Sequence, residues 1–361
     1  MNYSYKIGRI AGINIYVHMT WLFIFVLLAW SLSTDYFPAT YKFGVMTSWV
    51  LGIAAALLLF ASVLLHELSH SIVSKRNRMH VENITLFFFG GVAQVSPDEH
   101  GPKTELKISI AGPIMSVAIG IVFYALYTAN LGAGLTAIFD YLFKINLILA
   151  AFNMIPGYPL DGGRVLRSVL WIYYKDIIKA TKIASTAGQI FGFFLIITGF
   201  LGALGGGIGL WYILLGAFLV FLAKTGYEQV IVKERLSKIR VSDVMKPARL
   251  IDPTQTIAEF IADCEREMCS GIVKTGSKYY GMDLNLAAKV PAPAQDMAKV
   301  KDVMVAAKPV SQKDDCFKCL YQMQKQGVRV IPVQDKARLI GQVTEEQVTH
   351  MIRLAAIRGM R

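Results

Sequence analysis

The chain of 361 residues is strongly apolar and basic: 54% of its residues are hydrophobic, only 17% are charged, and the formal net charge is +12. Soluble domains carry about 25% charged residues, so this composition excludes a wholly soluble protein. In the first half the Lys and Arg residues cluster beside long apolar runs, as orientation in a lipid bilayer requires. We therefore expect a membrane partner and no nucleic acid.

The first two apolar runs are long enough to cross a membrane, since about 20 helical residues span a ~30 Å hydrocarbon layer. The core from His18 to Ser33 predicts a first span, and a polar loop is expected from Asp35 to Lys42. The second span runs from about Phe43 through His70. Three basic residues follow it and, by the positive-inside rule, mark the cytoplasmic surface: Lys75, Arg76 and Arg78.

The stretch from Glu82 to Ser96 is too short for a helical span, and its Gly90-Gly91 pair lies between β-prone flanks. This pattern predicts a β-hairpin. It either re-enters the membrane, where protein or water must satisfy its backbone, or connects two spans at the surface. An exposed edge of such a hairpin could pair with an extended peptide.

The uncharged stretch from Ile108 to Phe139 predicts a third span and the start of a fourth. Within it we interpret Ala111-Gly112-Pro113 as a site of close helix packing. Asp140 and Lys144 in the fourth span lie at i and i+4, so they can neutralise each other and are interpreted as structural.

Beyond the fourth span, the basic segment from Arg164 to Lys182 is amphipathic, so we expect it along the cytoplasmic surface. The uncharged stretch from Ile183 to Ala223 predicts a fifth and a sixth span. Six crossings return the chain to its starting side. Both termini are therefore expected to be cytoplasmic.

Two motifs in this region carry chemistry. His66-Glu67-Leu68-Ser69-His70 places two imidazoles at i and i+4 of a helix, where both can reach one metal ion, and Glu67 beside them can accept a proton from water. After the fourth span, NMIPGYPLDGGR (residues 153–164) breaks the helix with two prolines and three glycines. Asp161 is thereby left close to membrane depth, and a metal is the simplest partner for such a carboxylate.

From Val241 the chain repeats itself. VSDVMKPARLIDPTQTIAEF aligns without a gap on VKDVMVAAKPVSQKDDCFKC, which begins at Val300. This predicts two copies of one small α/β unit, each requiring the surface of the other. The cysteines all lie in this region, and we interpret them as reduced residues on helix faces rather than as a second zinc site: Cys264, Cys269, Cys316 and Cys319.

With HELSH in a hydrophobic span and NMIPGYPLDGGR after the fourth, the chain resembles the site-2 protease family of intramembrane zinc metalloproteases. The tandem repeat resembles a pair of CBS domains, and the combination is similar to the branch of the family that includes the protease activating a sporulation sigma factor. We expect a polytopic α-helical membrane protein, with six transmembrane helices and a re-entrant β-hairpin, plus a soluble α/β tandem CBS domain. The expected boundaries are residues 1–228 for the membrane metalloprotease domain, 229–240 for a linker and 241–361 for the CBS domain, with repeats at about 241–290 and 300–350.

The resemblance also assigns roles to residues. It implies that His66, His70 and Asp161 hold one Zn²⁺, and that Glu67 is the catalytic base. Three protein ligands leave a fourth position, as a catalytic zinc site requires.

The resemblance further implies how a substrate is held. Asn153 and the re-entrant loop FFFGGVAQV, which contains Gly90 and Gly91, would contact the substrate strand. The substrate would be a transmembrane protein, cut within or near its membrane segment in regulated intramembrane proteolysis. A prokaryotic plasma membrane is the expected location.

In the CBS pair, Gly341-Gln342-Val343-Thr344 resembles part of a nucleotide-binding G-h-h-T segment. The resemblance implies that ATP or AMP could bind through Gly341 and Thr344. However, Gln347 stands where an acidic ribose contact is usual, and the matching residues 281–284 are degenerate. A dimerisation module, giving a homodimer, or a docking module is therefore the other interpretation.

A channel or transporter and an inactive scaffold are the two other function classes considered for this sequence. In a channel or transporter with regulatory CBS domains, His66, His70 and Asp161 would line an ion pathway. That hypothesis does not explain why Glu67 directly follows His66. An inactive scaffold of protease ancestry is disfavoured because every expected catalytic residue is present.

Overall fold

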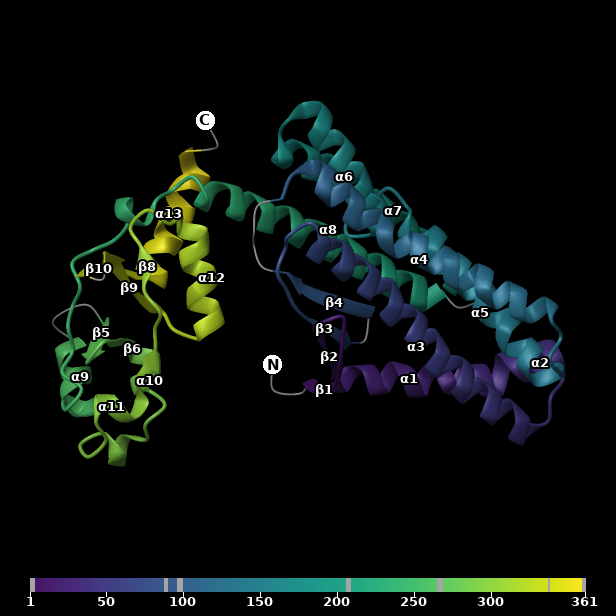
Figure 1. The fold of residues 1–361 in the computed structure, drawn as a ribbon, viewed down its shortest axis with the longest axis horizontal. Coiled ribbons are helices and arrows are strands. Elements are labelled where there is room, and N and C mark those ends of the chain that lie inside the picture. Colours follow the sequence, from purple (N-terminus) through teal and green to yellow (C-terminus); the bar gives the residue numbers. More distant parts are fainter. Residues whose placement is uncertain are drawn as a thin grey trace. The chain divides into compact units, whose positions relative to one another are not determined.

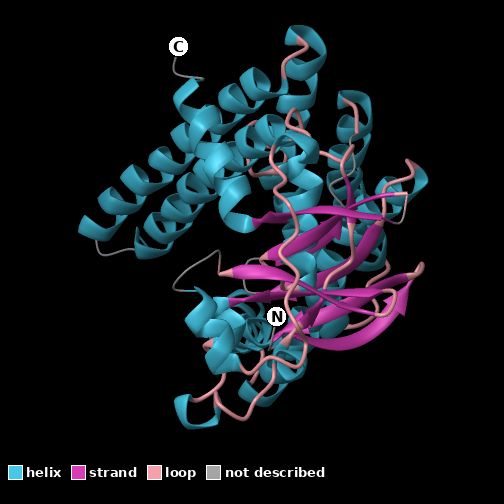
Figure 2. Ribbon diagram, turned by 90° about the vertical axis from the view of Figure 1, so that its left-hand side faces the viewer, coloured by secondary structure: helices cyan, strands magenta, loops and turns pink. Residues whose placement is uncertain are grey.

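A computed structural model of the chain describes residues 4–87, 90–95, 100–205, 209–264, 269–336 and 338–358. These residues form two compact units, 1–228 and 229–361, which are described separately. Figure 1 gives the order of the elements along the chain, and Figure 2 shows that helices predominate over strands.

The described residues contain six helical segments that are long and apolar enough to cross a membrane. They are Met19–Tyr41, which begins with α1 (Met19–Ser31), α3 (Val45–Arg76), α4 (Pro102–Thr128), α5 (Ala133–Asn153), α7 (Ile177–Leu204) and α8 (Gly209–Leu236). The shortest has 21 residues, about 32 Å at 1.5 Å per residue, and so matches a bilayer core. The predicted six apolar helices are thus present.

The outward faces of these helices are apolar. Large side chains that are more than half exposed occur on every one of them, for example Phe23, Val50, Ile121, Ile148, Ile197 and Phe221. A water-soluble surface rarely exposes so much apolar area, whereas lipid solvates it. The first unit is therefore a membrane-spanning helical assembly.

The expected polar loop at residues 35–42 is wrong, because this segment is helical. α1 continues through the π-helix η1 (Leu32–Tyr36) and α2 (Phe37–Tyr41), and Lys42 ends the run with a left-handed φ of 57°. Phe37 is fully buried and packs near Tyr141 of α5. Burial of this aromatic ring outweighs the local polarity that suggested a loop.

A four-stranded sheet in the first unit has the order β1-β2-β3-β4. Its strands are β1 (Ser4–Ile10), β2 (Ile13–His18), β3 (Val81–Phe87) and β4 (Gly90–Val95). The β2–β3 pair is parallel and the other two pairs are antiparallel. β3 and β4 form a hairpin within the predicted stretch, and the expected contact residues Phe88 and Phe89 and the end of the stretch at Ser96 lie outside the described residues.

The sheet packs against α3 at the height of the HELSH motif. Ile13 of β2 and Ile84 of β3 are fully buried and form one cluster with Leu68, the central residue of the motif. The N-terminal half of this sheet was not predicted. Since most side chains of β1 stay at least partly exposed, β1 lacks the buried alternation that identifies a strand.

The predicted amphipathic segment 164–182 is divided in two. α6 begins at Asp161 and ends at Tyr174, Lys175 adopts a left-handed φ of 54°, and α7 begins at Ile177. Lys179 and Lys182 therefore belong to the first turns of the fifth long apolar helix.

The second unit contains two three-stranded sheets, ordered β5-β6-β7 and β10-β9-β8. The first half comprises η2 (Val241–Asp243), α9 (Ile257–Cys264), β5 (Ser270–Thr275), β6 (Lys278–Asp283), α10 (Leu284–Ala287) and η3 (Ala292–Ala294). The second half comprises α11 (Val300–Val303), β7 (Val305–Ala306), β8 (Val310–Ser311), α12 (Cys316–Gln326), β9 (Val330–Asp335), β10 (Arg338–Thr344) and α13 (Glu345–Arg358). The helix and hairpin of each half occupy matching positions in the sequence repeat.

The two halves are interlocked through their entry segments. Arg240, just before the first repeat, bridges to Asp315 of the second, and Lys299, just before the second repeat, bridges to Thr256 of the first. The residues expected as a linker, 229–240, are helical up to Leu236, which is buried in the core of the second repeat. Neither half thus completes its core from its own repeat alone.

Candidate metal centre

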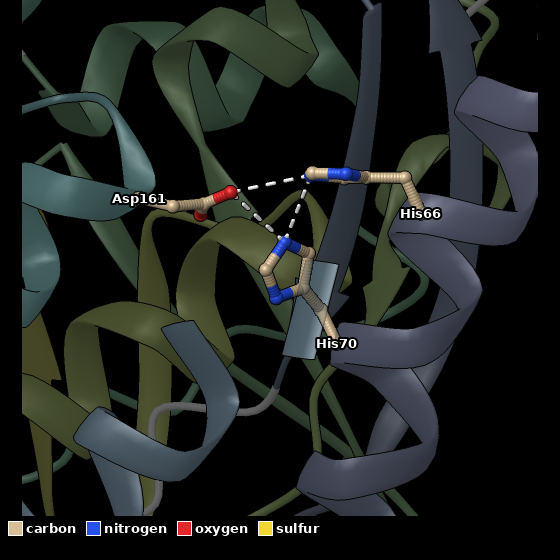
Figure 3. Close-up of side chains that lie close together, drawn as sticks. All are labelled: His66, His70 and Asp161. Atoms are coloured by element: carbon tan, nitrogen blue, oxygen red, sulfur yellow. Dashed lines mark hydrogen bonds and ion pairs between the residues drawn. The ribbon is translucent and has the colours of Figure 1, made fainter. Parts of the chain in front are cut away.

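Three buried side chains from two helices converge at one point. His66 and His70 lie one turn apart on α3, and Asp161 is the first residue of α6. The Oδ2 atom of Asp161 lies 3.2 Å from Nε2 of each histidine, and the two Nε2 atoms are 3.2 Å apart. Figure 3 shows this triangle of donor atoms.

Hydrogen bonds at the Nδ1 atoms of His66 and His70 orient the two imidazole rings. Nδ1 of His70 lies 2.6 Å from the carbonyl oxygen of Ile108. Because a carbonyl only accepts, Nδ1 carries the proton and Nε2 presents a lone pair to Asp161. Nδ1 of His66 lies 2.8 Å from Oγ of Ser116, which can accept a hydrogen bond from it in the same way. Three lone pairs that face one another at this distance form a position that a cation can occupy.

α4 supplies both orienting groups and also the space for the rings. A Cβ atom at Gly112 would overlap Nε2 of both histidines, so only glycine fits there. Ile108, Gly112 and Ser116 are spaced four residues apart and share one helix face. The sequence had suggested that Gly112 serves close helix packing, and the partner is now identified as the imidazole pair. The roles of Ile108 and Ser116 were missed, because a main-chain oxygen and a common serine leave no sequence motif.

Gly162 and Gly163, directly after Asp161, allow the start of α6 to pack against the preceding loop. A Cβ atom at Gly162 would overlap the carbonyl of Met154, and one at Gly163 would overlap backbone atoms of Gly157 and Tyr158. The chain between α5 and α6 therefore folds back against the first turn of α6, which needs the bare backbone of Gly162 and Gly163. This close approach fixes Asp161 opposite the histidines.

The other expected site residues lie around this triangle. Glu67 is half-buried and close enough to Asp161 for direct electrostatic interaction. Asn153 ends α5 and is half-buried, and among the described residues no hydrogen bond joins it to the three converging side chains. Gly90 and Gly91 begin β4, opposite Phe87 and Leu86.

The donor set and its dimensions fit zinc. Tetrahedral zinc with bonds of about 2.0–2.1 Å needs its donors about 3.3 Å apart. The three distances of 3.2 Å come close to that spacing. Two imidazoles and one carboxylate leave one position open, as catalytic zinc sites do. Within the described part of the chain, no other group of three or more His, Cys, Asp or Glu side chains is close enough to bind a metal.

The cysteines of the second unit lie in largely apolar surroundings. Cys316 and Cys319 are fully buried on α12, and burial raises the pKa of both thiols to about 12. Burial likewise raises the pKa of the Cys264 thiol to about 12. Cys316 and Cys319 belong to the apolar core of the second repeat, and Cys264 packs against that of the first.

Fold and site together define a class: a polytopic helical membrane protein with an HExxH metal centre. The sequence model of Peptidase family M50 matches residues 54–135 and 128–198. The chain belongs to this family, which agrees with the resemblance to site-2 proteases noted in the sequence.

Similar proteins support that membership. The chain is 39% identical to sll0528 of Synechocystis over 73% of its own length and 70% of the relative, and 34% identical to zinc metalloprotease MJ0392 of Methanocaldococcus jannaschii over 72% of each. It is also 35% identical to Rip3 of Mycobacterium tuberculosis over 68% of its own length. That alignment spans 64% of Rip3, so slightly more than one third of the relative has no counterpart in the alignment.

Solved structures are similar to each part of the chain. The site-2 protease from Methanocaldococcus jannaschii is 33% identical and has a TM-score of 0.45, covering 62% of this chain and 94% of that one. The CBS domain of a bacterial CNNM/CorC family Mg²⁺ transporter in complex with ATP is 17% identical and has a TM-score of 0.30, covering 36% of this chain and 97% of that one. The CBS interpretation rests on the sequence repeat and the two matching halves of the second unit.

Proposed function

We propose that this protein is an intramembrane zinc metalloprotease that hydrolyses peptide bonds within or near transmembrane segments of other membrane proteins. The observation that carries the proposal is the triangle of Nε2, Nε2 and Oδ2 atoms, with Glu67 beside it, on a helix apolar enough to span a bilayer. Such a reaction would release regulators or clear membrane remnants, as in regulated intramembrane proteolysis.

The chain's own residues divide the chemistry between them. His66, His70 and Asp161 would hold the metal. Zinc supplies a Lewis acid, which polarises a carbonyl and lowers the pKa of water towards about 7. Glu67, next to His66, accepts a proton from the attacking water and donates it to the nitrogen of the leaving amine.

A helical substrate must unwind before its carbonyl can be attacked. In the described sheet β4 is an outer strand, so one edge of its backbone faces away from β3. An unwound peptide could pair with that edge and regain the hydrogen bonds it loses. We propose that the backbone at Gly90 and Gly91 and the side chain of Asn153 guide the substrate in this way.

The position of the site in its helix supports access from the cytoplasm. His70 and His66 precede Lys75 by five and nine residues, or about 8 and 14 Å along α3. If Lys75 lies at the cytoplasmic surface, water needs to penetrate only that far. We propose a multi-pass location in a prokaryotic plasma membrane with both termini in the cytoplasm.

We also propose residues 1–228 as the metalloprotease domain and 241–361 as a tandem CBS domain that could regulate it. The structure gives Gly341 and Thr344 local roles. A Cβ at Gly341 would lie only 2.7 Å from the carbonyl of Lys246, and Thr344 Oγ1 accepts the N–H of Gln347 at 3.3 Å. Binding of ATP or AMP and CBS-mediated homodimerisation remain predictions, which calorimetric titration and light scattering of the full chain can test.

Cleavage tests the proposed activity directly. The full-length protein in detergent is incubated with a panel of single-span membrane proteins, and products are mapped by mass spectrometry before and after zinc is stripped and restored. We expect cuts within or near the span that disappear with the metal and return with it. If no substrate is cut and the protein instead carries ions across liposome membranes, the channel hypothesis replaces the protease.

A further inference from the structure

The two oxygen atoms of Asp161 have different neighbours. Oδ2 is the atom that faces both histidines at 3.2 Å. Oδ1 lies on the other side of the carboxylate, 4.0 Å from Nη1 of Arg164. Asp161 and Arg164 are three residues apart on α6, so this contact lies along one face of the helix. The carboxylate is thus divided between the metal position and a guanidinium.

Arg164 is in turn placed between two carboxylates. Its Nε atom lies 4.0 Å from Oε1 of Glu105, a fully buried residue on α4. Glu105 Oε1 also accepts hydrogen bonds from Arg167, through Nε at 2.8 Å and through Nη2. The guanidinium of Arg167 lies over the ring of Tyr158, 5.1 Å from its centroid. Two acids and two arginines therefore form one compensated network next to the metal position.

The network joins α4, which orients the two histidines, to α6, which carries Asp161. Glu105 precedes Ile108 by three residues on α4, the helix that orients both histidines. Arg164 and Arg167 lie one turn apart on α6, the helix that begins with Asp161. A buried carboxylate is costly unless it is paired. Glu105 is paired with these two arginines, which directly follow Asp161 along α6. Glu105 therefore attracts Arg164 towards α4 through an ion pair at 4.0 Å, while its hydrogen bonds hold Arg167.

We propose that Arg164 is a positioning residue that restrains Oδ1 of Asp161, so that the carboxylate offers only Oδ2 to the metal. The proposal rests on the proposed zinc site. A second carboxylate oxygen on the metal would fill the position that a catalytic site keeps for water. Glu105 and Arg167 act through Arg164 by holding it beside the carboxylate. A purely structural network would join α4 to α6 without affecting how Asp161 binds.

Cobalt(II) spectroscopy separates these two roles. Full-length protein in detergent is loaded with Co²⁺ in place of zinc, and the visible d–d absorption is compared between wild type, Arg164→Met and Glu105→Gln. Absorption falls as a fifth donor joins a four-coordinate ion, so we expect about twofold weaker bands in Arg164→Met and a smaller change in the same direction in Glu105→Gln.

Asp140→Asn provides the matched control. Asp140 is also a buried acid of the first unit, and it accepts from Lys144 Nζ at 2.6 Å and from Tyr41, away from the site. Both Glu105→Gln and Asp140→Asn should lower the melting temperature, because each removes the charge of a buried carboxylate that a basic side chain neutralises. Only the first should change the cobalt spectrum. A loss of stability alone would therefore not produce the expected change in the cobalt spectrum.

The outcomes distinguish the two proposals. A wild type that binds neither cobalt nor zinc would overturn the metal site and this inference with it. A wild type that binds both, with an unchanged spectrum in Arg164→Met, would overturn the inference alone. If Arg164→Met does not fold, Arg164→Lys keeps the charge and should retain the wild-type spectrum while Glu105→Gln alters it; any other pattern contradicts the proposal.

Discussion

Gly112→Ala is expected to weaken zinc binding without destabilising α4, the helix that contains residue 112. Alanine is favoured over glycine inside a helix by up to about 1 kcal/mol, so α4 itself should not suffer. The new methyl group, however, would overlap Nε2 of His66 and Nε2 of His70. Accommodating one extra carbon in a packed site costs about 1–3 kcal/mol. If the imidazoles move away to relieve the overlap, that energy corresponds to roughly 5- to 150-fold weaker zinc binding.

Gly120→Ala is the matched substitution, two turns further along α4. A Cβ there would lie 3.2 Å from Cδ2 of Leu147, the end of a flexible side chain that can move by a few tenths of an ångström. Zinc content and chelator competition are measured on both variants and on wild type, together with circular dichroism and melting temperature. We expect normal zinc binding in Gly120→Ala and weakened binding in Gly112→Ala, with native helix content in both.

Two results would refute this reasoning. Wild-type zinc affinity in Gly112→Ala would mean that the rings do not lie against α4 in the folded protein. Equal loss of zinc in both variants would mean that α4 responds to added volume in general, and that Gly112 has no particular relation to the histidines.

Three further predictions concern other parts of the structure. Ser116→Ala removes the hydroxyl beside Nδ1 of His66, and chelator competition should show zinc binding about 10- to 100-fold weaker; unchanged affinity would exclude an orienting role. With thiol pKa values raised to about 12, Cys316 and Cys319 are almost fully protonated at pH 8. Iodoacetamide should therefore modify these two residues about 10³-fold more slowly than an ordinary exposed thiol, with the rate rising about tenfold per pH unit. Rapid labelling of Cys316 or Cys319 at pH 8, located by mass spectrometry of the folded protein, would contradict this assignment. Gln342→Leu breaks two partly buried hydrogen bonds between the repeats at about 1 kcal/mol each. It should lower the melting temperature of the second unit while leaving zinc content unchanged.

Local sequence patterns predicted the long apolar helices and the tandem repeat well. Uncharged runs longer than a bilayer core have few alternatives to a helix, because lipid cannot satisfy an open backbone. The segment at residues 35–42 was predicted wrongly, since its helical form depends on Phe37 packing near Tyr141, a contact between residues far apart in sequence. β1 was missed for a similar reason. Backbone pairing with β2 defines this strand, and none of its side chains is buried, so its sequence shows no alternating apolar pattern.

The converging site residues could be predicted because each belongs to a spaced motif. The i, i+4 pair of His66 and His70 and the helix-breaking sequence before Asp161 both constrain local geometry strongly. The supporting groups could not be found in this way. Ile108 contributes only a carbonyl, and Glu105 becomes significant only once α6 places two arginines beside it. Such roles depend on tertiary packing between helices.

The central claim is that Glu67 performs proton transfer at a metal held by His66, His70 and Asp161. The most direct test measures cleavage and bound zinc on the same preparations of wild type, Glu67→Gln and Asp161→Ala. We expect Glu67→Gln to retain one zinc per chain and to lose at least about 10²-fold in cleavage rate, while Asp161→Ala loses both zinc affinity and cleavage. Glu67→Gln cutting as fast as wild type, or Asp161→Ala binding zinc as tightly, would contradict the assignment.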